Sequence, residues 1–423
     1  PWQDMLVIKS SEEINVNQSL DEKTVIPDVS LNKVDFYSKT GKLYDHQIDF
    51  MKYAVGRDLE HKTSGFLVLD QMGAGKTLEA INLALYNRKF HQFNHCLILC
   101  CVNTSKYNWM NEIEEHTNGE YEGYILGTRI TKRGKTNYVG SSQDKLEDLL
   151  SGKKYGEKDG DDLPYFLILN VEALRMRKGK EFPIKTSLTA LINANYVNMV
   201  VIDEVHKNLS PQSQQGHCLI DIKKKTGQKA YWLPMTGTPI VNKPTDLYVP
   251  LRLIDAHSIN SSYAWDKYFC IYGGFGGYEI VGYKNMSSLK DMLQPNSIRR
   301  LKDDILDLPD KVEFIEFVEN TKYQDKLYRE VLLDLISHKE EIVESINPLA
   351  KMLKLRQVNG SPELVDDTLE VDSNYIKHNA KLVRLMTLVE EIKARGEKAV
   401  IFSNWVEPLR TIFRYLKPHY NIA

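Results

Sequence analysis

A short glycine-rich stretch, "LDQMGAGKT" at residues 69–77, has the residue types that bind the phosphates of a nucleotide. Small residues let backbone N–H groups wrap phosphate oxygens, a lysine reaches the β- and γ-phosphates, and a hydroxyl binds Mg²⁺. Asp70 stands where the general pattern has its first glycine, and a short polar side chain that bonds to the nearby backbone also enters such turns. We expect the nucleotide to contact Met72, Gly73, Ala74, Gly75, Lys76 and Thr77.

An adjacent pair of acids, Asp203 and Glu204, ends the apolar run in "VVIDEVHKN" at residues 200–208. In phosphoryl transfer one carboxylate holds Mg²⁺, mostly through water, and another orients and activates the attacking water. An isolated acidic pair at a strand end is more typical of a solvated surface, but this pair follows a phosphate loop in the same strand-rich region. We therefore assign catalysis to Lys76, Asp203 and Glu204, and the metal to Thr77 and Asp203.

Alternating strands and helices must position these residues. The run "GFLVLD" ends at the phosphate loop, and similar apolar runs at 96–102, 165–171, 199–205 and 231–237 are each followed by polar or helical sequence. This alternation predicts a doubly wound α/β fold with parallel central strands. Functional residues are then expected at the carboxyl ends of the strands. A glycine-rich stretch at 273–283, "GGFGGYEIVGY", has no such context and is interpreted as a hairpin.

Composition limits the class of protein. The chain has 423 residues, of which 42% are hydrophobic and 26% charged, enough for two or three domains with real cores. A formal net charge of −2 gives no global attraction to nucleic acid, so any DNA contact needs a local basic face. The five cysteines show no paired spacing that predicts disulfides or zinc. We expect an intracellular protein, cytoplasmic or nuclear, with no membrane partner.

Taken together, the motifs resemble those of the Swi/Snf-type ATPases of helicase superfamily two. The segment "LYDHQIDFMKYA" precedes "DQMGAGKT", and "CCVNTSKYNWMNEI" lies between "DQMGAGKT" and "DEVH". After "DEVH" come "LPMTGTPIVNKPTDLY" and "SIRRLKDDILDLPDK". The resemblance implies two RecA-like lobes with parallel central sheets and helical insertions, the second lobe incomplete in this chain. It implies an N-terminal arm at 1–40, lobe 1 at 41–310 with an insertion near 255–310, and the start of lobe 2 at 311–423. Strands are expected at "VEFIEFV" and "IFSNW".

The resemblance also implies roles for further residues. Gln47 would read the edge of the adenine base. Trp109 is the aromatic marker of the motif "CCVNTSKYNWMNEI". The segment "LPMTGTPIVNKPTDLY" would link the γ-phosphate to the DNA. The residues implied in that coupling are His206, Thr236, Gly237 and Thr238, and those implied in DNA contact are Asn103, Thr104, Asn170 and Lys178. Lys178 belongs to one of three basic clusters, at 131–135, 175–180 and 222–229, all expected in loops.

The implied activity is ATP- and Mg²⁺-dependent movement on DNA, double-stranded and without sequence specificity, because backbone contacts carry no base information. The sequence does not identify protein partners, or choose between unwinding, annealing and remodelling. No arginine here matches the family's γ-phosphate motif, so we expect little hydrolysis from this chain alone. Two alternatives stay open: a motor subunit of a restriction or defence complex, and a non-hydrolysing, nucleotide-switched DNA clamp.

Overall fold

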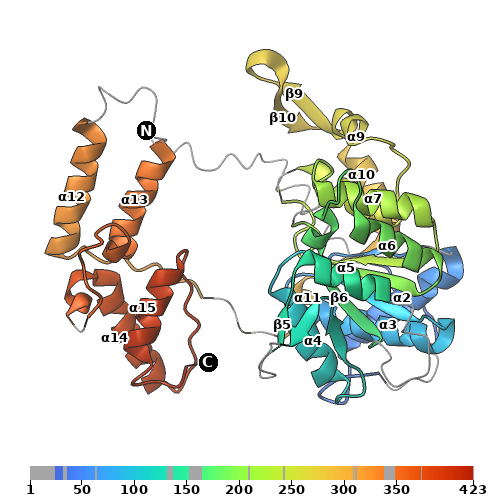
Figure 1. The fold of residues 1–423 in the computed structure, drawn as a ribbon, viewed down its shortest axis with the longest axis horizontal. Helices are drawn as coiled ribbons and strands as arrows, with labels where there is room; N and C mark the ends of the chain where they lie inside the picture. The colour runs from blue at the N-terminus through green and yellow to red at the C-terminus, as the bar shows by residue number, and fades with distance from the viewer. Residues whose placement is uncertain are drawn as a thin grey trace. The chain divides into compact units, whose positions relative to one another are not determined.

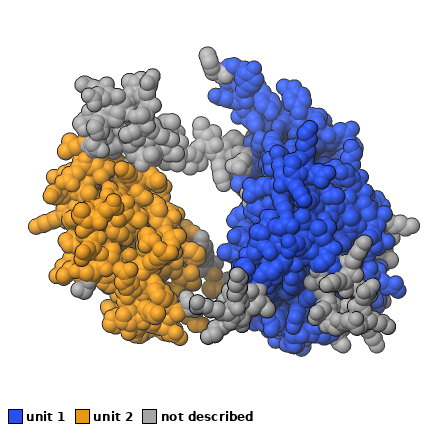
Figure 2. All heavy atoms as spheres, viewed as in Figure 1, with its two compact units in different colours: residues 1–308 blue, residues 309–423 orange. Residues whose placement is uncertain are grey.

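The computed structural model describes residues 24–31, 36–61, 64–130, 137–151, 164–207, 210–241, 243–307, 309, 312–337, 348–372 and 374–422. The chain divides into two compact units, residues 1–308 and residues 309–423, which Figure 2 colours separately. The basic cluster at 131–135 lies outside the described residues. The predicted lobe boundary at 310 stays a prediction.

Unit 1 is built on a five-stranded sheet in which each neighbouring pair of strands runs parallel. The predicted α/β class with a parallel central sheet is confirmed. The β2 strand lies at the centre, so its carboxyl end and that of its neighbour β7 meet at one edge of the sheet. In spatial order the strands are β3 (Gly123–Ile125), β6 (Phe166–Asn170), β2 (His95–Cys100), β7 (Val197–Asp203) and β8 (Tyr231–Pro234).

A second parallel pair extends this sheet. Strand β1 (Leu67–Val68) pairs with β11 (Ser297–Ile298). Single parallel bridges join Gly65 to Trp232 and Val68 to Met235, which places β1 beside β8. The short strand that leads into the phosphate loop is thus supported on one side by the main sheet and on the other by residues from the end of unit 1.

Helices cover both faces of the sheet (Figure 1). Along β2, Ile98 faces one core cluster while Leu97 and Leu99 face the other. Strands buried on both faces are apolar throughout, which explains the uninterrupted run "CLILC". One face packs against α2 (Asp45–His61), α3 (Lys76–His91) and α4 (Ser105–His116), the other against α5 (Ser142–Ser151), α6 (Pro183–Asn193), α7 (Gln214–Thr226) and α8 (Tyr248–Leu253).

The region between α8 and β11 holds the predicted hairpin. Strands β9 (Cys270–Gly273) and β10 (Glu279–Tyr283) pair antiparallel, which confirms the hairpin interpretation of the glycine-rich stretch. In Figure 1 the hairpin projects beyond the helices that flank it. Those helices are α9 (Ser262–Phe269) and α10 (Met286–Leu293).

The described part of the predicted N-terminal arm packs on unit 1. Ile26, Leu31 and Phe36 pack against the core cluster that α2 and α3 help to form. The backbone N–H of Tyr37 donates to Asn82 Oδ1 at 2.8 Å. These residues are therefore part of the packed unit.

In unit 2 the structure differs from the prediction. Both segments expected to be strands, 312–318 and 401–405, form no strand and have no sheet partner among the described residues. Their large side chains are exposed: Phe314 by 86%, Phe317 by 95% and Phe402 by 88%. An extended segment becomes a strand only when a neighbour pairs with its backbone groups. The described regular elements are helices, chiefly α12 (Lys322–Ser337), α13 (Pro348–Gly360), α14 (Ala380–Ala394) and α15 (Val406–Leu416).

No helix in the described parts of either unit combines the length and the apolar character needed to cross a membrane.

Candidate nucleotide-binding site

The phosphate loop joins β1 to α3 and owes its glycines to backbone conformation. Gly73 and Gly75 have φ of 85° and 89°, in the left-handed region that side chains disfavour. A Cβ at Gly73 would lie 2.9 Å from Lys302 Nζ, and one at Gly75 would lie 2.6 Å from Gln47 Nε2. The backbone conformation therefore favours glycine at both positions, whereas the two neighbouring atoms are the ends of flexible side chains that could move aside.

Lys76 is the first residue of α3 and is buried at the base of the loop. Its ammonium donates to the carbonyl oxygens of Asp70, at 2.8 Å, and Gln71, at 3.1 Å. Burial lowers the pKa of Lys76, while the nearby carboxylates of Glu204 and Asp203 act in the opposite direction. The loop thus encloses a poorly solvated cation, which is the condition under which a contact to phosphate is strongest.

A pocket of about 570 Å³ opens in front of the loop, within the size range of small-molecule sites. Ala74, predicted to contact nucleotide, does not line it: this residue is buried and its carbonyl accepts from His46 Nε2 at 3.0 Å. The loop turns this one residue toward α2, and its contact with nucleotide stays a prediction. The predicted residues that do line the pocket are Gln47, Met72, Gly73, Gly75, Lys76, Thr77, Asp203 and Glu204.

Asp203, at the end of β7, is held by Trp109 of α4. The indole Nε1 donates to Asp203 Oδ2 at 3.1 Å, and Trp109 is buried and also lines the pocket. Burial raises the pKa of Asp203, and the hydrogen bond from Trp109 opposes that effect. The aromatic marker of the sequence motif is therefore a partner of the predicted metal carboxylate, a role that spacing alone did not reveal.

We predict that Trp109→Phe, which keeps the ring but removes the donor, weakens Mg²⁺ binding by roughly 10-fold, as loss of an outer-shell partner does at other metal sites. The measurement is a Mg²⁺ titration of the fluorescence of a labelled ATP analogue. Trp232→Phe is the matched control, because Trp232 is buried in β8 and its Nε1 has no hydrogen-bond partner among the described residues. Equal Mg²⁺ requirements in Trp109→Phe and the unaltered chain would contradict the prediction.

Glu204 occupies a strained backbone position beside His206. Its φ of 52° is unusual for a residue with a side chain, and such strain is concentrated at functional sites. His206 Nδ1 lies 3.2 Å from Glu204 Oε2 and 2.6 Å from Thr236 Oγ1. The hydrogen bond from His206 lowers the pKa of Glu204, against the effect of burial. The carboxylate predicted to activate water is thus kept ionised.

The segment after β8 lies against the phosphate loop. Thr236 is buried, and its Oγ1 accepts from the backbone N–H of Thr238 at 3.1 Å. A Cβ at Gly237 would lie 3.0 Å from the backbone nitrogen of Met72. The structure therefore places all four predicted coupling residues around Glu204 and the loop. Their role in coupling stays a prediction.

Three of the four predicted DNA-contacting residues gather at the carboxyl ends of β2 and β6. Asn170 Nδ2 donates to Asn103 Oδ1 at 2.8 Å, and Lys106 Nζ, which the sequence analysis missed, donates to the same oxygen at 2.9 Å. Asn170 Oδ1 is buried with no hydrogen-bond partner in the described part of the chain. Thr104 adjoins this cluster in the chain, whereas Lys178 lies in a separate exposed turn with Glu181.

The basic cluster at 222–229 is a correction. It was expected in a loop, but its first half is the last turn of α7. Lys223 is buried, 2.8 Å from Asp255 Oδ2, and donates to the carbonyl of Gly227 at 2.9 Å. Lysines at a helix C-terminus complement the helix dipole, so this cluster has a structural explanation.

Asp70 does not act through local turn contacts as expected. The only described partner of its carboxylate is Arg300, which follows β11 and donates through Nε at 3.2 Å to Oδ1 and 3.1 Å to Oδ2. Arg300 also donates to Glu79 Oε1 at 2.7 Å. An arginine in a family motif and two acids among apolar residues are visible in the sequence, but nothing in it shows that Arg300 pairs with Asp70 and Glu79.

Two known proteins are similar to this chain over most of its length. The DNA repair and recombination protein RAD26 of Saccharomyces cerevisiae is 25% identical over 421 residues, covering 89% of this chain and 37% of its own length. The ISWI chromatin-remodeling complex ATPase CHR11 of Arabidopsis thaliana is 25% identical over 385 residues, covering 89% and 32%. The chain therefore spans about a third of the length of the curated relatives it matches.

Among solved structures, the SWI2/SNF2 ATPase core of Sulfolobus solfataricus in complex with dsDNA is similar at 21% identity and a TM-score of 0.46, covering 92% of this chain and 72% of that one. The family model described as the SNF2-related domain matches residues 46–364. Because that match covers more than half of its residues, the chain belongs to the SNF2-related domain family.

Proposed function

We propose that the chain forms the nucleotide site of a DNA-dependent ATPase that couples MgATP hydrolysis to movement on duplex DNA. The observation that carries this proposal is the single pocket in which the phosphate loop, Lys76 and the Asp203–Glu204 pair meet. Family membership supports it, as do the names of the relatives, one a DNA repair and recombination protein and another a chromatin-remodeling complex ATPase.

In this proposal the ATP phosphates bind along the loop, and the Lys76 ammonium exchanges its two carbonyl contacts for phosphate oxygens. Gln47 lines the same pocket and would read the adenine base of ATP. The donor set fits magnesium, because the Thr77 hydroxyl and the Asp203 carboxylate are hard oxygen ligands that line one pocket. Magnesium, when bound, would neutralise negative charge on the phosphates.

Glu204 accepts a proton from the water that attacks the γ-phosphoryl group. Its lowered pKa keeps it ionised for that role at neutral pH. His206 contacts both Glu204 and Thr236, so a shift of the segment after β8 would directly affect the Glu204 carboxylate. This connection is the chain's own candidate for coupling the state of the nucleotide to bound DNA.

We propose that DNA phosphates contact Asn103, Thr104 and Asn170, with the Lys106 ammonium supplying charge. The Asn170 oxygen without a partner is an acceptor, so a bridging water or an N–H donor would satisfy it. Phosphate contacts position the duplex without reading bases, which makes the expected binding independent of sequence. Lys178 stays a weaker candidate because it lies apart from this cluster.

The test is an ATPase titration of the natural protein with duplex and single-stranded DNA. We expect duplex DNA to stimulate turnover, and DNA affinity to fall by ~10-fold or more between ~50 and ~200 mM salt, because phosphate contacts release counterions. Displacement of a third strand from a triplex, without separation of the duplex, would mark movement along DNA.

Lys76→Ala is the control that removes the nucleotide site from this assay. Turnover that duplex DNA leaves unchanged at low salt would contradict the proposal. Turnover that appears only after a nuclease or methylase subunit is added would favour the defence-complex motor. DNA binding that responds to ATP without any hydrolysis would favour the clamp.

A further inference from the structure

Two acids beside the phosphate loop are fully buried and share one cation. Asp70, immediately before the loop, and Glu79, in the first turn of α3, are 0% and 1% exposed. Arg300 donates to both carboxylates and also to the backbone carbonyl of His46 at the start of α2. The Arg300 guanidinium thus joins Asp70 at the entry of the loop, α3 after the loop, and α2, which supplies Gln47 to the pocket.

Backbone contacts continue this attachment along the loop. The N–H of Leu69 donates to the carbonyl of Ile298 at 2.8 Å, and the N–H of Gln71 donates to that of Arg300 at 3.2 Å. Gln71 Oε1 in turn accepts from the N–H of Lys302 at 2.9 Å. Residues 298–302 therefore run beside the loop in a fixed register, as an extension of the β1–β11 pair.

The backbone does not explain the aspartate. Asp70 is absent from the positive-φ residues of the described chain, unlike Gly73 and Gly75, so its position accepts a side chain and does not demand glycine. What demands an acid there is Arg300, whose side chain is only 10% exposed. Removing one partner of a buried ion pair leaves the other charge uncompensated, which is strongly unfavourable.

We propose that Arg300 is a positioning residue of the nucleotide site: by holding Asp70 and Glu79 together it fixes the phosphate loop in the conformation that binds ATP. This inference rests on the proposed function of the pocket. Arginine is required because its planar guanidinium reaches both carboxylate oxygens of Asp70 and, at the same time, Oε1 of Glu79. A lysine ammonium is a single point charge. Arg300 itself does not line the pocket, so its effect passes through the loop.

The decisive variant is Asp70→Gly, which restores the glycine of the general phosphate-loop pattern but leaves Arg300 with Glu79 as its one remaining acidic partner among the described residues. We expect it to weaken binding of a labelled ATP analogue by ~10- to 10²-fold, the loss that follows small misplacement of a binding group. Arg300→Lys should weaken binding by a similar factor. Asp70→Asn keeps the shape of the side chain. If either other variant fails to fold, the affinity of Asp70→Asn for the ATP analogue tests the inference.

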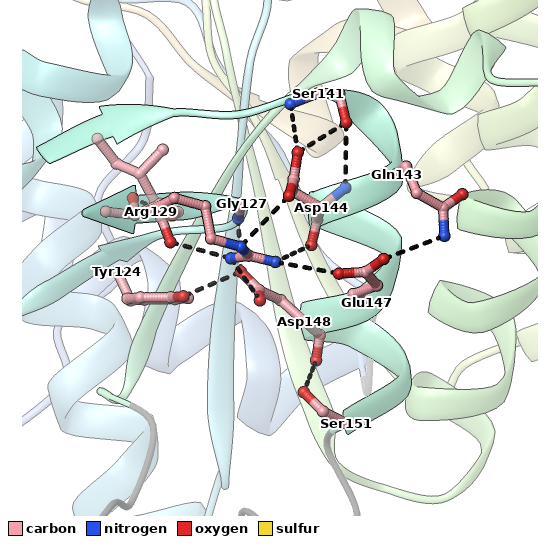
Figure 3. Close-up of polar contacts among 11 residues, drawn as sticks. Tyr124, Gly127, Arg129, Ser141, Gln143, Asp144, Glu147, Asp148 and Ser151 are labelled. Carbon is pink, nitrogen blue, oxygen red and sulfur yellow. Dashed lines mark hydrogen bonds and ion pairs between the residues drawn. The ribbon is translucent and has the colours of Figure 1, made fainter. Parts of the chain in front are cut away.

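Arg129 supplies the matched control, because it makes a comparable network away from the pocket (Figure 3). On β4 (Thr128–Ile130) its guanidinium lies 2.9 Å from Asp148, 3.3 Å from Asp144 and 3.6 Å from Glu147, all on α5. Arg129→Ala removes three ion pairs, whereas Arg300 makes two, with Asp70 and Glu79. It should lower the Tm and leave nucleotide affinity unchanged.

A second measurement separates positioning from mere stability. Hydrogen–deuterium exchange of peptides spanning 297–305 should slow when nucleotide binds the unaltered chain, and this protection should be lost in Arg300→Lys. Variants at Asp70 and Arg300 that melt earlier but bind nucleotide as tightly as the unaltered chain would overturn the inference. Failure of the unaltered chain to bind MgATP would instead overturn the proposed function.

Discussion

Lys76→Ala is expected to abolish measurable ATP binding while the fold stays intact. The Lys76 ammonium is buried at the loop and donates to the carbonyl oxygens of Asp70 and Gln71, so its removal costs the nucleotide-free protein these two hydrogen bonds to neutral acceptors. The bound state loses charge-assisted contacts to two phosphates, each worth about 1.5–3 kcal/mol, so affinity should fall by ~10² or more. Isothermal titration calorimetry with MgATP measures the loss.

Lys89→Ala is the control for that variant. Lys89 lies in the last turn of the same helix, and its side chain is exposed above the ring of Phe90. It removes a lysine from α3 without touching the loop, so nucleotide affinity should not change. Nucleotide affinity that survives in Lys76→Ala would remove the site assignment.

The second large effect is expected from Glu204→Gln, which should bind MgATP normally and lose turnover by roughly 10²-fold or more, the usual contribution of a general base. The amide keeps the shape and the position of the side chain but cannot accept the proton of the attacking water. Pre-steady-state and steady-state ATPase assays on the natural protein, alongside a binding titration, separate the two properties. Normal turnover in this variant would show that Glu204 is not the base.

The pH profile gives an independent check on Glu204. Because His206 lowers the pKa of this carboxylate, turnover should persist as pH falls until the depressed pKa is reached, and only then decline. His206→Ala removes the largest effect that lowers the pKa of Glu204, so that burial is opposed only by the charges of Lys76 and Lys207 and the pKa rises. The acid limb of the kcat profile should therefore move to higher pH in His206→Ala. An unmoved limb would mean that another group controls it.

Local patterns in the sequence pointed to most of the residues that line this pocket, because each motif consists of residues only a few positions apart. Gly73 and Gly75 follow from backbone conformation at one turn, and the Asp203–Glu204 pair follows a strand whose burial its own sequence reveals. Doubly wound topology then brings strand ends together without further information. Such patterns did not show that Ala74 lies outside the pocket lining, because a turn of one residue decides which side of the loop faces the pocket.

Contacts between distant segments were out of reach. Arg300 and Asp70 are separated by 230 residues, and neither position reveals its partner in the sequence. The cluster at 222–229 was misplaced because lysines in the last turn of a helix have the same composition as a basic loop. Residues 312–318 have the sequence of a strand, but pairing requires a neighbour that the segment itself does not specify.

The β1–β11 pair also sets the order in which the site can form during synthesis. β1 and the glycine loop leave the ribosome early, but the strand that supports them and the cation that neutralises Asp70 and Glu79 lie at 297–300. Contacts of such long sequence separation form late, since a large loop must close first. A nascent chain that has not reached residue 300 would keep two acids uncompensated beside an unpaired strand edge. On the proposal that Arg300 positions the phosphate loop, we expect competence to bind nucleotide to arise only when unit 1 is almost complete.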